Sequence, residues 1–275
     1  MKLNEALIIF LLTIFCAPQL FSTDFLITIS GQYALGTEIV SYPSTSGNII
    51  NIATSNVVLD LANHIIDQDP STISVSNVNG IEVNSGLSNI TIKNGTVRGV
   101  TGAGIKIGAG CSNIIVDNIL TDSCFSDGIY FNGSTARPIT DSQIKNCWIL
   151  RCSNNVVASE SFETPPLWLS NCQRTYVANC TINLTGTFSN STPQNAVGCV
   201  ELDNCTSCLV ENVNMYDDWT FGGVVLNQAS FAGSGTVGSI VRNCIYSGAT
   251  GAPATGSGAG ALATVGAFCV VYGTK

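Results

Sequence analysis

Two consecutive stretches of equal length decide the fold: GIEVNSGLSNITIKNGTVRGVTGA at residues 80–103 and GIKIGAGCSNIIVDNILTDSCFSD at residues 104–127. Each begins with a glycine and a short segment in which apolar and polar residues alternate. Each also contains a longer alternating segment that leads to an asparagine, Asn94 or Asn118. Alternation with a period of two indicates strands with one buried face. Repetition at a short, fixed interval is typical of solenoids, in which successive coils stack on one another.

The repeat continues beyond these two stretches. Asparagines that match the first one recur at intervals of 24, 28, 33, 33 and 31 residues, and they are Asn94, Asn118, Asn146, Asn179, Asn212 and Asn243. An aliphatic residue stands two positions before each: Ile92, Val116, Ile144, Val177, Val210 and Val241. We expect the aliphatic column to point inward. We expect the asparagines to form a buried ladder, because a stacked amide can donate to one neighbour and accept from the other.

A second strand of each repeat shows the same alternation. Its inward positions are predicted to be Ile81, Ile105, Ile129, Leu167, Val200 and Val224. The residues that directly follow these must point outward, and they are Glu82, Lys106, Tyr130, Trp168, Glu201 and Val225. Asp203 follows Glu201 by two residues and therefore faces the same way.

The ends of the chain have a different composition. Residues 1–22 have the layout of a secretory signal, with Lys2 followed by an apolar stretch that is too short to span a bilayer. No later stretch is apolar enough for a transmembrane helix. We therefore expect a secreted or cell-surface protein with a β domain at residues 23–247. The tail at 248–275 is rich in Gly and Ala and contains a terminal strand near 265–272.

The net charge limits the classes of partner, and the positions of the cysteines indicate whether they are buried or bind metal. The formal net charge of −8 argues against nucleic acid, since a polyanion would be repelled. Most of the 12 cysteines occupy repeat positions that other coils fill with Leu, Ile or Val, which indicates buried thiols, although export also permits disulfides. No thiol or histidine pattern predicts a metal site. The sequence does not fix the oligomeric state.

The runs ITISGQYAL, NIINIATSNVVLDLANHII and GIEVNSGLSNITIKNGTVRG resemble the repeats of the pectate-lyase-like superfamily. The resemblance covers roughly residues 27–246 and implies an all-β, right-handed parallel β-helix, here of about seven coils. That superfamily mixes polysaccharide lyases, glycoside hydrolases, phage tailspikes and non-catalytic surface proteins, so it implies no single activity. Its enzymes place their sites on a strand face bordered by loops.

The outward column suits such a site. The connections from Asn146 to Leu167 and from Asn179 to Val200 take 21 residues where most coils use 11 or 12, so long loops are predicted to wall this face. Further extra residues at 132–138 and 227–237 are predicted to lengthen its other border. Tyr130 on one coil and Trp168 on the next are predicted to form an exposed flat platform for sugar rings.

Two hypotheses about function stay open at this point. In the first, the protein binds a polysaccharide or cell-surface glycan and cleaves it, with Glu201 and Asp203 as catalytic acid and base. Lys106 and Arg174 are the predicted cationic substrate-binding residues, and either could serve as the base of a lyase. A lyase would bring in Ca²⁺, whereas a hydrolase needs no cofactor. In the second hypothesis the chain is a non-catalytic surface, adhesive or structural protein.

Overall fold

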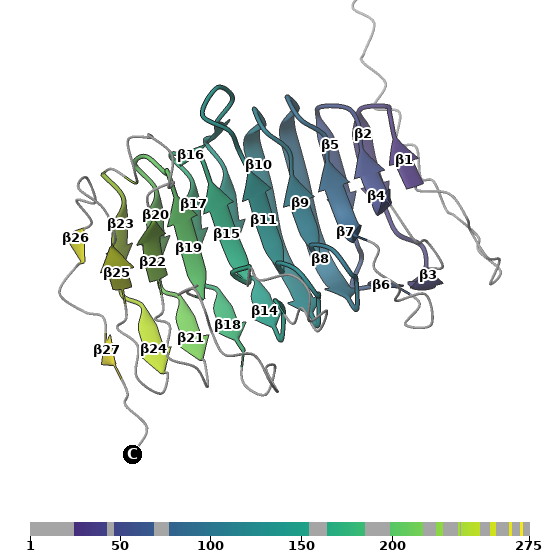
Figure 1. The fold of residues 1–275 in the computed structure, drawn as a ribbon. Helices are drawn as coiled ribbons and strands as arrows, with labels where there is room; N and C mark the ends of the chain where they lie inside the picture. Colours follow the sequence, from purple (N-terminus) through teal and green to yellow (C-terminus); the bar gives the residue numbers. More distant parts are fainter. Residues whose placement is uncertain are drawn as a thin grey trace, which may run out of the picture.

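The computed structural model describes residues 25–42, 47–68, 77–153, 164–184, 199–216, 224–227, 236, 238–247, 254–256, 264–265 and 270–271. The predicted signal segment at 1–22 and most of the tail lie outside these residues. Within them every regular element is a β-strand. The strands stack into one elongated body, from β1 at one end to β26 and β27 at the other (Figure 1).

One face of the body is a parallel sheet, called sheet A here, with nine strands. In order they are β1 (Phe25–Ile27), β4 (Gly47–Ile52), β7 (Val78–Val83), β9 (Ile105–Ile107), β11 (Ile129–Asn132), β15 (Leu167–Ser170), β19 (Val200–Asp203), β22 (Val224–Asn227) and β25 (Ala254–Gly256). The register places Ile81, Ile105, Ile129, Leu167, Val200 and Val224 in one column, which confirms the predicted alignment.

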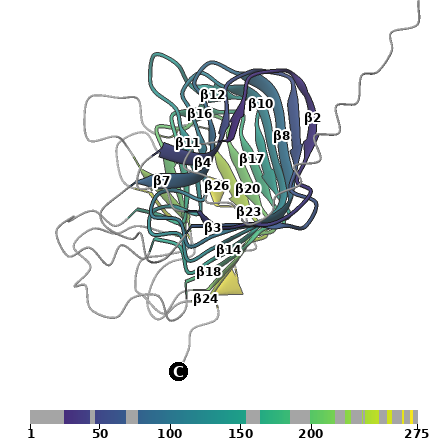
Figure 2. The same cartoon turned by 90° about the vertical axis from the view of Figure 1, so that its right-hand side faces the viewer.

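Two further parallel sheets close each coil, as the view along the stack shows (Figure 2). Sheet B contains β2 (Gly31–Ala34), β5 (Val57–Asp60), the first parts of β8 (Ser88–Arg98) and β10 (Ser112–Asp122), β13 (Gln143–Lys145), β17 (Tyr176–Ala178), β20 (Leu209–Glu211), β23 (Ile240–Arg242) and β26 (Thr264–Val265), with β12 (Ile139–Thr140) and β16 (Cys172–Gln173) at its border. Sheet C contains β3 (Ile39–Tyr42), β6 (Ile65–Gln68), the second parts of β8 and β10, β14 (Trp148–Leu150), β18 (Thr181–Asn183), β21 (Asn214–Tyr216), β24 (Ile245–Ser247) and β27 (Val270–Val271). The stacked coils thus form the parallel β-helix that the repeat predicted.

Aliphatic side chains fill the interior. Ile92, Val116, Ile144, Val177, Val210 and Val241 are all fully buried, as are Ile81, Ile105, Ile129, Leu167 and Val200 of sheet A. Each coil places its apolar residues directly above those of the previous coil, so the core runs the length of the stack. Burial of this kind is the main stabilising contribution in such a fold.

The asparagine column differs from the prediction in one respect. All six asparagines adopt left-handed backbone angles, with φ between 52° and 58°, at the bend where sheet B meets sheet C. Asn tolerates this conformation better than other residues with a side chain. An amide ladder is present, as in the bond from Asn118 Nδ2 to Asn94 Oδ1 at 3.0 Å, but Asn118 and four others are exposed and Asn94 is half-buried. The predicted burial of the ladder is therefore wrong, because the bend turns these side chains outward.

Ten cysteines lie in the described residues, and all ten are buried free thiols. Several stack on one another in adjacent coils, such as Cys147 below Cys180, and their sulfurs contact backbone carbonyls. Burial raises the pKa of Cys205 well above its usual value. The predicted core thiols are confirmed for these ten, while Cys16 and Cys269 lie outside the described residues.

Candidate functional site

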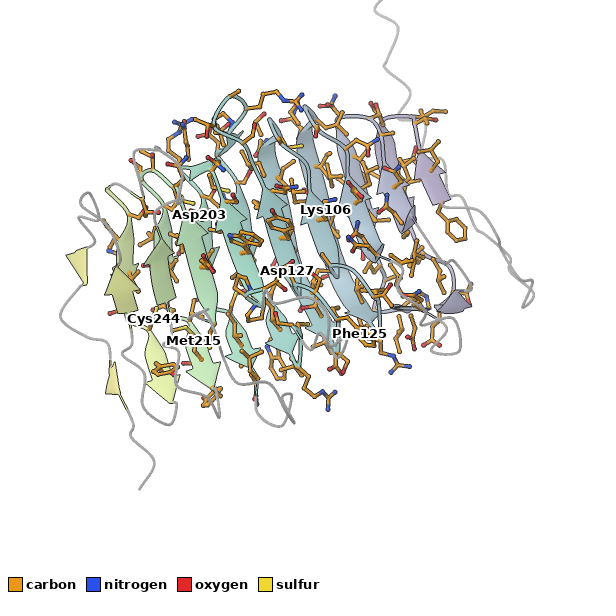
Figure 3. The ribbon with its side chains drawn as sticks, in the orientation of Figure 1. Lys106, Phe125, Asp127, Asp203, Met215 and Cys244 are labelled. Carbon is orange, nitrogen blue, oxygen red and sulfur yellow. The ribbon has the colours of Figure 1, made fainter. Side chains whose placement is uncertain are left out.

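The outward face of sheet A carries the predicted column of polar and aromatic residues. The strand register places Glu82, Lys106, Tyr130, Trp168, Glu201 and Val225 side by side on six successive strands. Asp203 lies at the end of β19, two residues beyond Glu201. Figure 3 shows Lys106, Asp127 and Asp203 on the side of the molecule that sheet A faces.

The two aromatic rings of this column stack on each other. The ring centroids of Tyr130 and Trp168 are 4.6 Å apart and their planes differ by 12°. Each ring therefore covers one face of the other, and both side chains are half-buried. The predicted flat platform is wrong, because strands at the spacing of a β-sheet bring neighbouring rings into contact along the stack. What the pair offers to a ligand is therefore the part of the two half-buried rings that the stacking leaves exposed.

Asp127 is a buried carboxyl next to this pair. It lies in the turn that leads into β11, and its side chain is only 2% exposed. The Ser126 hydroxyl donates to Oδ2 at 2.8 Å, while Oδ1 has no hydrogen-bond partner. Burial, with a smaller contribution from the nearby Glu201 carboxylate, raises the pKa of Asp127 from 3.8 to about 7. Asp127 can therefore hold or release a proton near neutral pH.

Two more ionisable groups share this environment. Burial raises the pKa of the Asp203 carboxyl, one of whose oxygens is buried without a partner. Burial, followed by the charges of Asp127 and Asp203, raises the pKa of the Tyr130 hydroxyl, which donates to Asn132 Oδ1 at 2.9 Å. Glu201 is 6% exposed. Asp127 and Glu201 are thus held out of water, while Asp203 is half-buried.

Buried polar atoms without partners recur along the same face. Among the described residues there are six such side-chain atoms, and three of them are Asp127 Oδ1, Trp168 Nε1 and Asp203 Oδ1. These three residues belong to the adjacent coils of β11, β15 and β19. A fourth, Asn51 Oδ1, lies farther along the same outward column. Buried polar groups in proteins nearly always have partners, so this group needs an explanation.

The predicted cationic residues lie in two different places. Lys106 is in the outward column, beside Tyr130, with its Nζ 3.4 Å from Glu82 Oε1. Arg174 is an exposed residue at the border of sheet B and makes two hydrogen bonds, at 2.6 and 2.8 Å, to Asp141. It occupies a second turn column, in which Asn56, Asn89 and Asn113 also have left-handed angles. Arg174 therefore belongs to another surface and is not part of the site on sheet A.

The loops predicted to wall this face are mostly outside the described residues. Residues 154–163, 185–198 and 228–235 are among those not described. The turn at 133–138 is described, and there the Asn171 amide donates to the Gly133 carbonyl at 3.3 Å. This turn forms one border of sheet A beyond β11.

Comparison with known proteins settles the family. The family model described as the right-handed β-helix region matches residues 40–197, which is more than half of the chain. The chain belongs to this right-handed β-helix family. No curated protein matches the sequence.

Solved structures with a similar shape are distant from this β-helix protein. An alginate lyase from Paenibacillus sp. str. FPU-7 has 12% identity and a TM-score of 0.49, with 84% of this chain and 90% of the lyase chain covered. The protein titled ORF18 of Geobacillus virus E2 has 12% identity and a TM-score of 0.47, with 85% of this chain and 49% of the viral chain covered. Likenesses at this level concern the fold and carry no argument about activity.

Sequence reasoning missed Asp127. It precedes Gly128, which starts the strand, so it belongs to a turn and not to the alternating pattern that revealed the other residues. The sequence did contain one signal for Asp127. At the matching position, the two preceding coils of this β-helix protein have the uncharged residues Asn79 and Ala103. A single carboxyl in an uncharged inner turn column is an uncommon feature.

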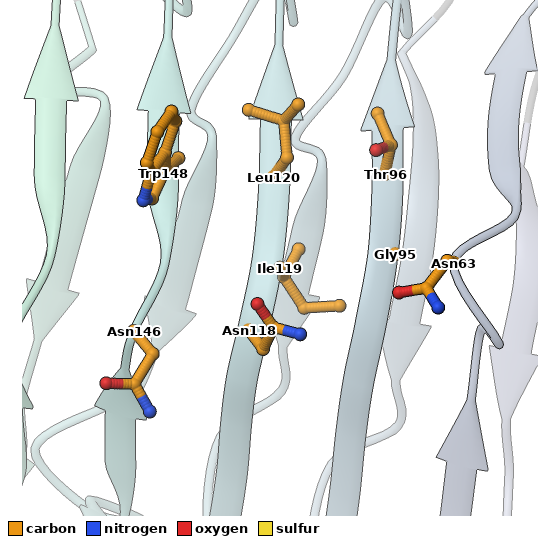
Figure 4. A pocket seen from close by; sticks show the side chains of 8 residues that line it. All are labelled: Asn63, Gly95, Thr96, Asn118, Ile119, Leu120, Asn146 and Trp148. Carbon is orange, nitrogen blue, oxygen red and sulfur yellow. The ribbon is translucent and has the colours of Figure 1, made fainter.

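A hollow lies away from the outward face of sheet A, over β8, β10 and β14 (Figure 4). It has a volume of about 220 Å³, and its lining includes Asn118, Asn146 and the 58%-exposed Trp148. Its polar side chains are amides and a hydroxyl, so it holds no group that could transfer a proton near neutral pH.

In the described part of the chain, no group of three or more His, Cys, Asp or Glu side chains is placed to hold a metal ion. The same residues include no helix that is long and apolar enough to cross a membrane.

Proposed function

We propose that this protein is exported, that it binds an extracellular polysaccharide along the outward face of sheet A, and that it hydrolyses the glycan there. The observation that supports this is the group of buried atoms without partners, Asp127 Oδ1, Trp168 Nε1 and Asp203 Oδ1. Sugar hydroxyls both donate and accept hydrogen bonds, so they can satisfy an indole N–H and carboxyl oxygens alike. The half-exposed Tyr130 and Trp168 rings provide apolar contact for a sugar ring.

The carboxyls provide the chemistry of glycoside hydrolysis. Asp127, with its pKa raised to about 7, donates a proton to the leaving glycosidic oxygen as the bond to the anomeric carbon breaks. Glu201 or Asp203 accepts a proton from the water that attacks the same carbon. Glu201 is near enough to Asp127 to contribute to the raised pKa of that carboxyl.

The proposal is tested with a glycan-binding screen followed by assays for new reducing ends and for unsaturated products. We expect Asp127→Asn, Glu201→Gln and Asp203→Asn each to lower turnover by about 10²-fold or more, since amides keep the shape but cannot exchange protons. Binding of the intact glycan should change by less than about tenfold in the three variants. Glu38→Gln is the matched control, because Glu38 is exposed on another part of the molecule and the same charge is removed.

Three outcomes would count against parts of this proposal. Unsaturated products would show a lyase and not a hydrolase. Binding without turnover in the wild-type protein would favour the non-catalytic surface protein. Wild-type turnover in all three variants, with a verified substrate, would place the site elsewhere on the molecule.

A further inference from the structure

The charges of the β-helix indicate which class of glycan this face accepts, an inference that rests on the proposed function. The chain has ten Lys and Arg residues, of which Lys2 and Lys275 stand at its ends outside the described residues. The other eight are described, and all but Arg137 form an ion pair with an Asp or Glu of a neighbouring coil. Arg137 is exposed at the border turn, where its Cβ lies near Gly110. Almost every cation of the solenoid thus has an acidic partner already.

The face of sheet A carries an excess of acidic groups. Lys106 is the lysine of the outward column, and Glu82 balances its charge at 3.4 Å. Among the described residues, Asp127 and Asp203 form no ion pair, and Glu201 is close enough to Asp127 to contribute to the raised pKa of that carboxyl. Deprotonation of Asp127 and Asp203 therefore adds negative charge that no ion pair within the described part of the chain offsets.

The segments that connect the coils add no positive charge in the sequence. Residues 154–163 and 185–198 contain no Lys or Arg, and neither do 217–223 and 228–235. The first of these segments contains Glu160 and Glu163, and the third contains Asp217 and Asp218. Wherever these segments lie, they cannot supply a cation.

A polyuronate carries one carboxylate on every sugar. Placed on partly desolvated carboxyls, such a chain would meet like charges in a medium that screens them weakly. Eliminative cleavage would further require a cation to neutralise the uronate carboxylate next to the proton that is abstracted. A neutral sugar is not repelled by the carboxylates and needs no cation to neutralise it. Its hydroxyls can form hydrogen bonds with the carboxyl oxygens and with the indole N–H.

We propose that this face selects an uncharged glycan, a chain of neutral or N-acetylated hexoses, and rejects polyuronates. The Asp127 and Asp203 carboxyls produce this selection, and the stacked Tyr130 and Trp168 rings supply contact that is independent of charge.

The test compares oligosaccharides of equal length. The neutral probes are the hexasaccharides of cellulose, mannan and chitin. The charged probes are the hexasaccharides of polygalacturonate and polymannuronate. Affinities of the full chain are measured by titration calorimetry at about pH 7.5 and about 150 mM NaCl. We expect at least one neutral probe to bind about tenfold or more tightly than either uronate. Raising the salt concentration should strengthen any residual uronate binding, because it screens repulsion.

Two variants connect the selection to these carboxyls. Asp203→Asn and Asp127→Asn should each raise the affinity for uronate relative to the neutral probe by about threefold or more, whereas the control Glu38→Gln should leave the ratio unchanged. If a uronate binds as tightly as the neutral probes, or binds more weakly as salt rises, the inference is wrong while glycan binding stands. If no probe of either class binds, the proposed function fails, and this inference fails with it.

Discussion

At the scale of single residues, the orientation of Trp168 decides what the site can offer. The ring is half-buried against Tyr130 and its Nε1 is buried without a partner, so it is both a packing residue and a donor for a ligand. An exposed aromatic residue would contribute little to stability. A stacked pair contributes about 1 kcal/mol beyond its buried area.

This gives a prediction for stability. We expect Trp168→Ala to lower the free energy of unfolding by about 2 kcal/mol, through loss of stacking and of partly buried area. Trp148→Ala is the control, since Trp148 is 58% exposed, and it should cost less than about 0.5 kcal/mol. Urea denaturation measures both, and equal, near-zero effects would show that the ring does not pack as described.

At the scale of elements, stacking of equivalent strands sets both the core and the site. Val177 on β17 lies between Ile144 and Val210 and is fully buried. Because each inward residue contacts its equivalents in the coils on both sides, a charge placed there has no partner on either side.

Val177→Asp should therefore destabilise the fold severely, by about 4 kcal/mol or more. Thr181→Asp on β18 is the control, because Thr181 is only partly buried and should cost about 1 kcal/mol or less. Circular dichroism with thermal unfolding compares the two variants. A Val177→Asp protein as stable as the control would contradict the register.

The strand pattern also explains which parts of the site could be predicted from the sequence. The inward and outward columns could be predicted for the coils between Ile81 and Val224, because parallel stacking repeats the same alternation on every coil. The orientation of the Trp168 ring was not, because alternation fixes the face of a side chain and not its rotamer. The pairing of Arg174 with Asp141 was missed because the second turn column, which includes Asn56 and Asn89, was not recognised.

At the scale of the whole molecule, the distribution of charge separates this face from the rest of the solenoid. Ion pairs between coils, such as Arg151 with Asp122 and Arg242 with Glu211, balance charges along sheets B and C. The sheet A face instead keeps Asp127 buried and Asp203 half-buried, and neither forms an ion pair with a described residue. Such an arrangement costs stability when the carboxyls ionise, which is common at functional sites.

The most direct test of this account is the pH dependence of global stability in the wild-type protein and in Asp127→Asn. The pKa of Asp127 is about 7 in the folded protein, against 3.8 for an ordinary Asp, so between these values the folded state binds more protons at this group than the unfolded state. Its contribution to stability is then complete below about pH 4 and is lost as the pH rises through 7. We predict that the stability of wild type relative to Asp127→Asn falls by about 4 kcal/mol from pH 4 to pH 8, as measured by urea denaturation. A difference that stays constant over this range, or that grows with pH, would show that Asp127 carries no proton near neutral pH and would contradict its assignment as the proton donor.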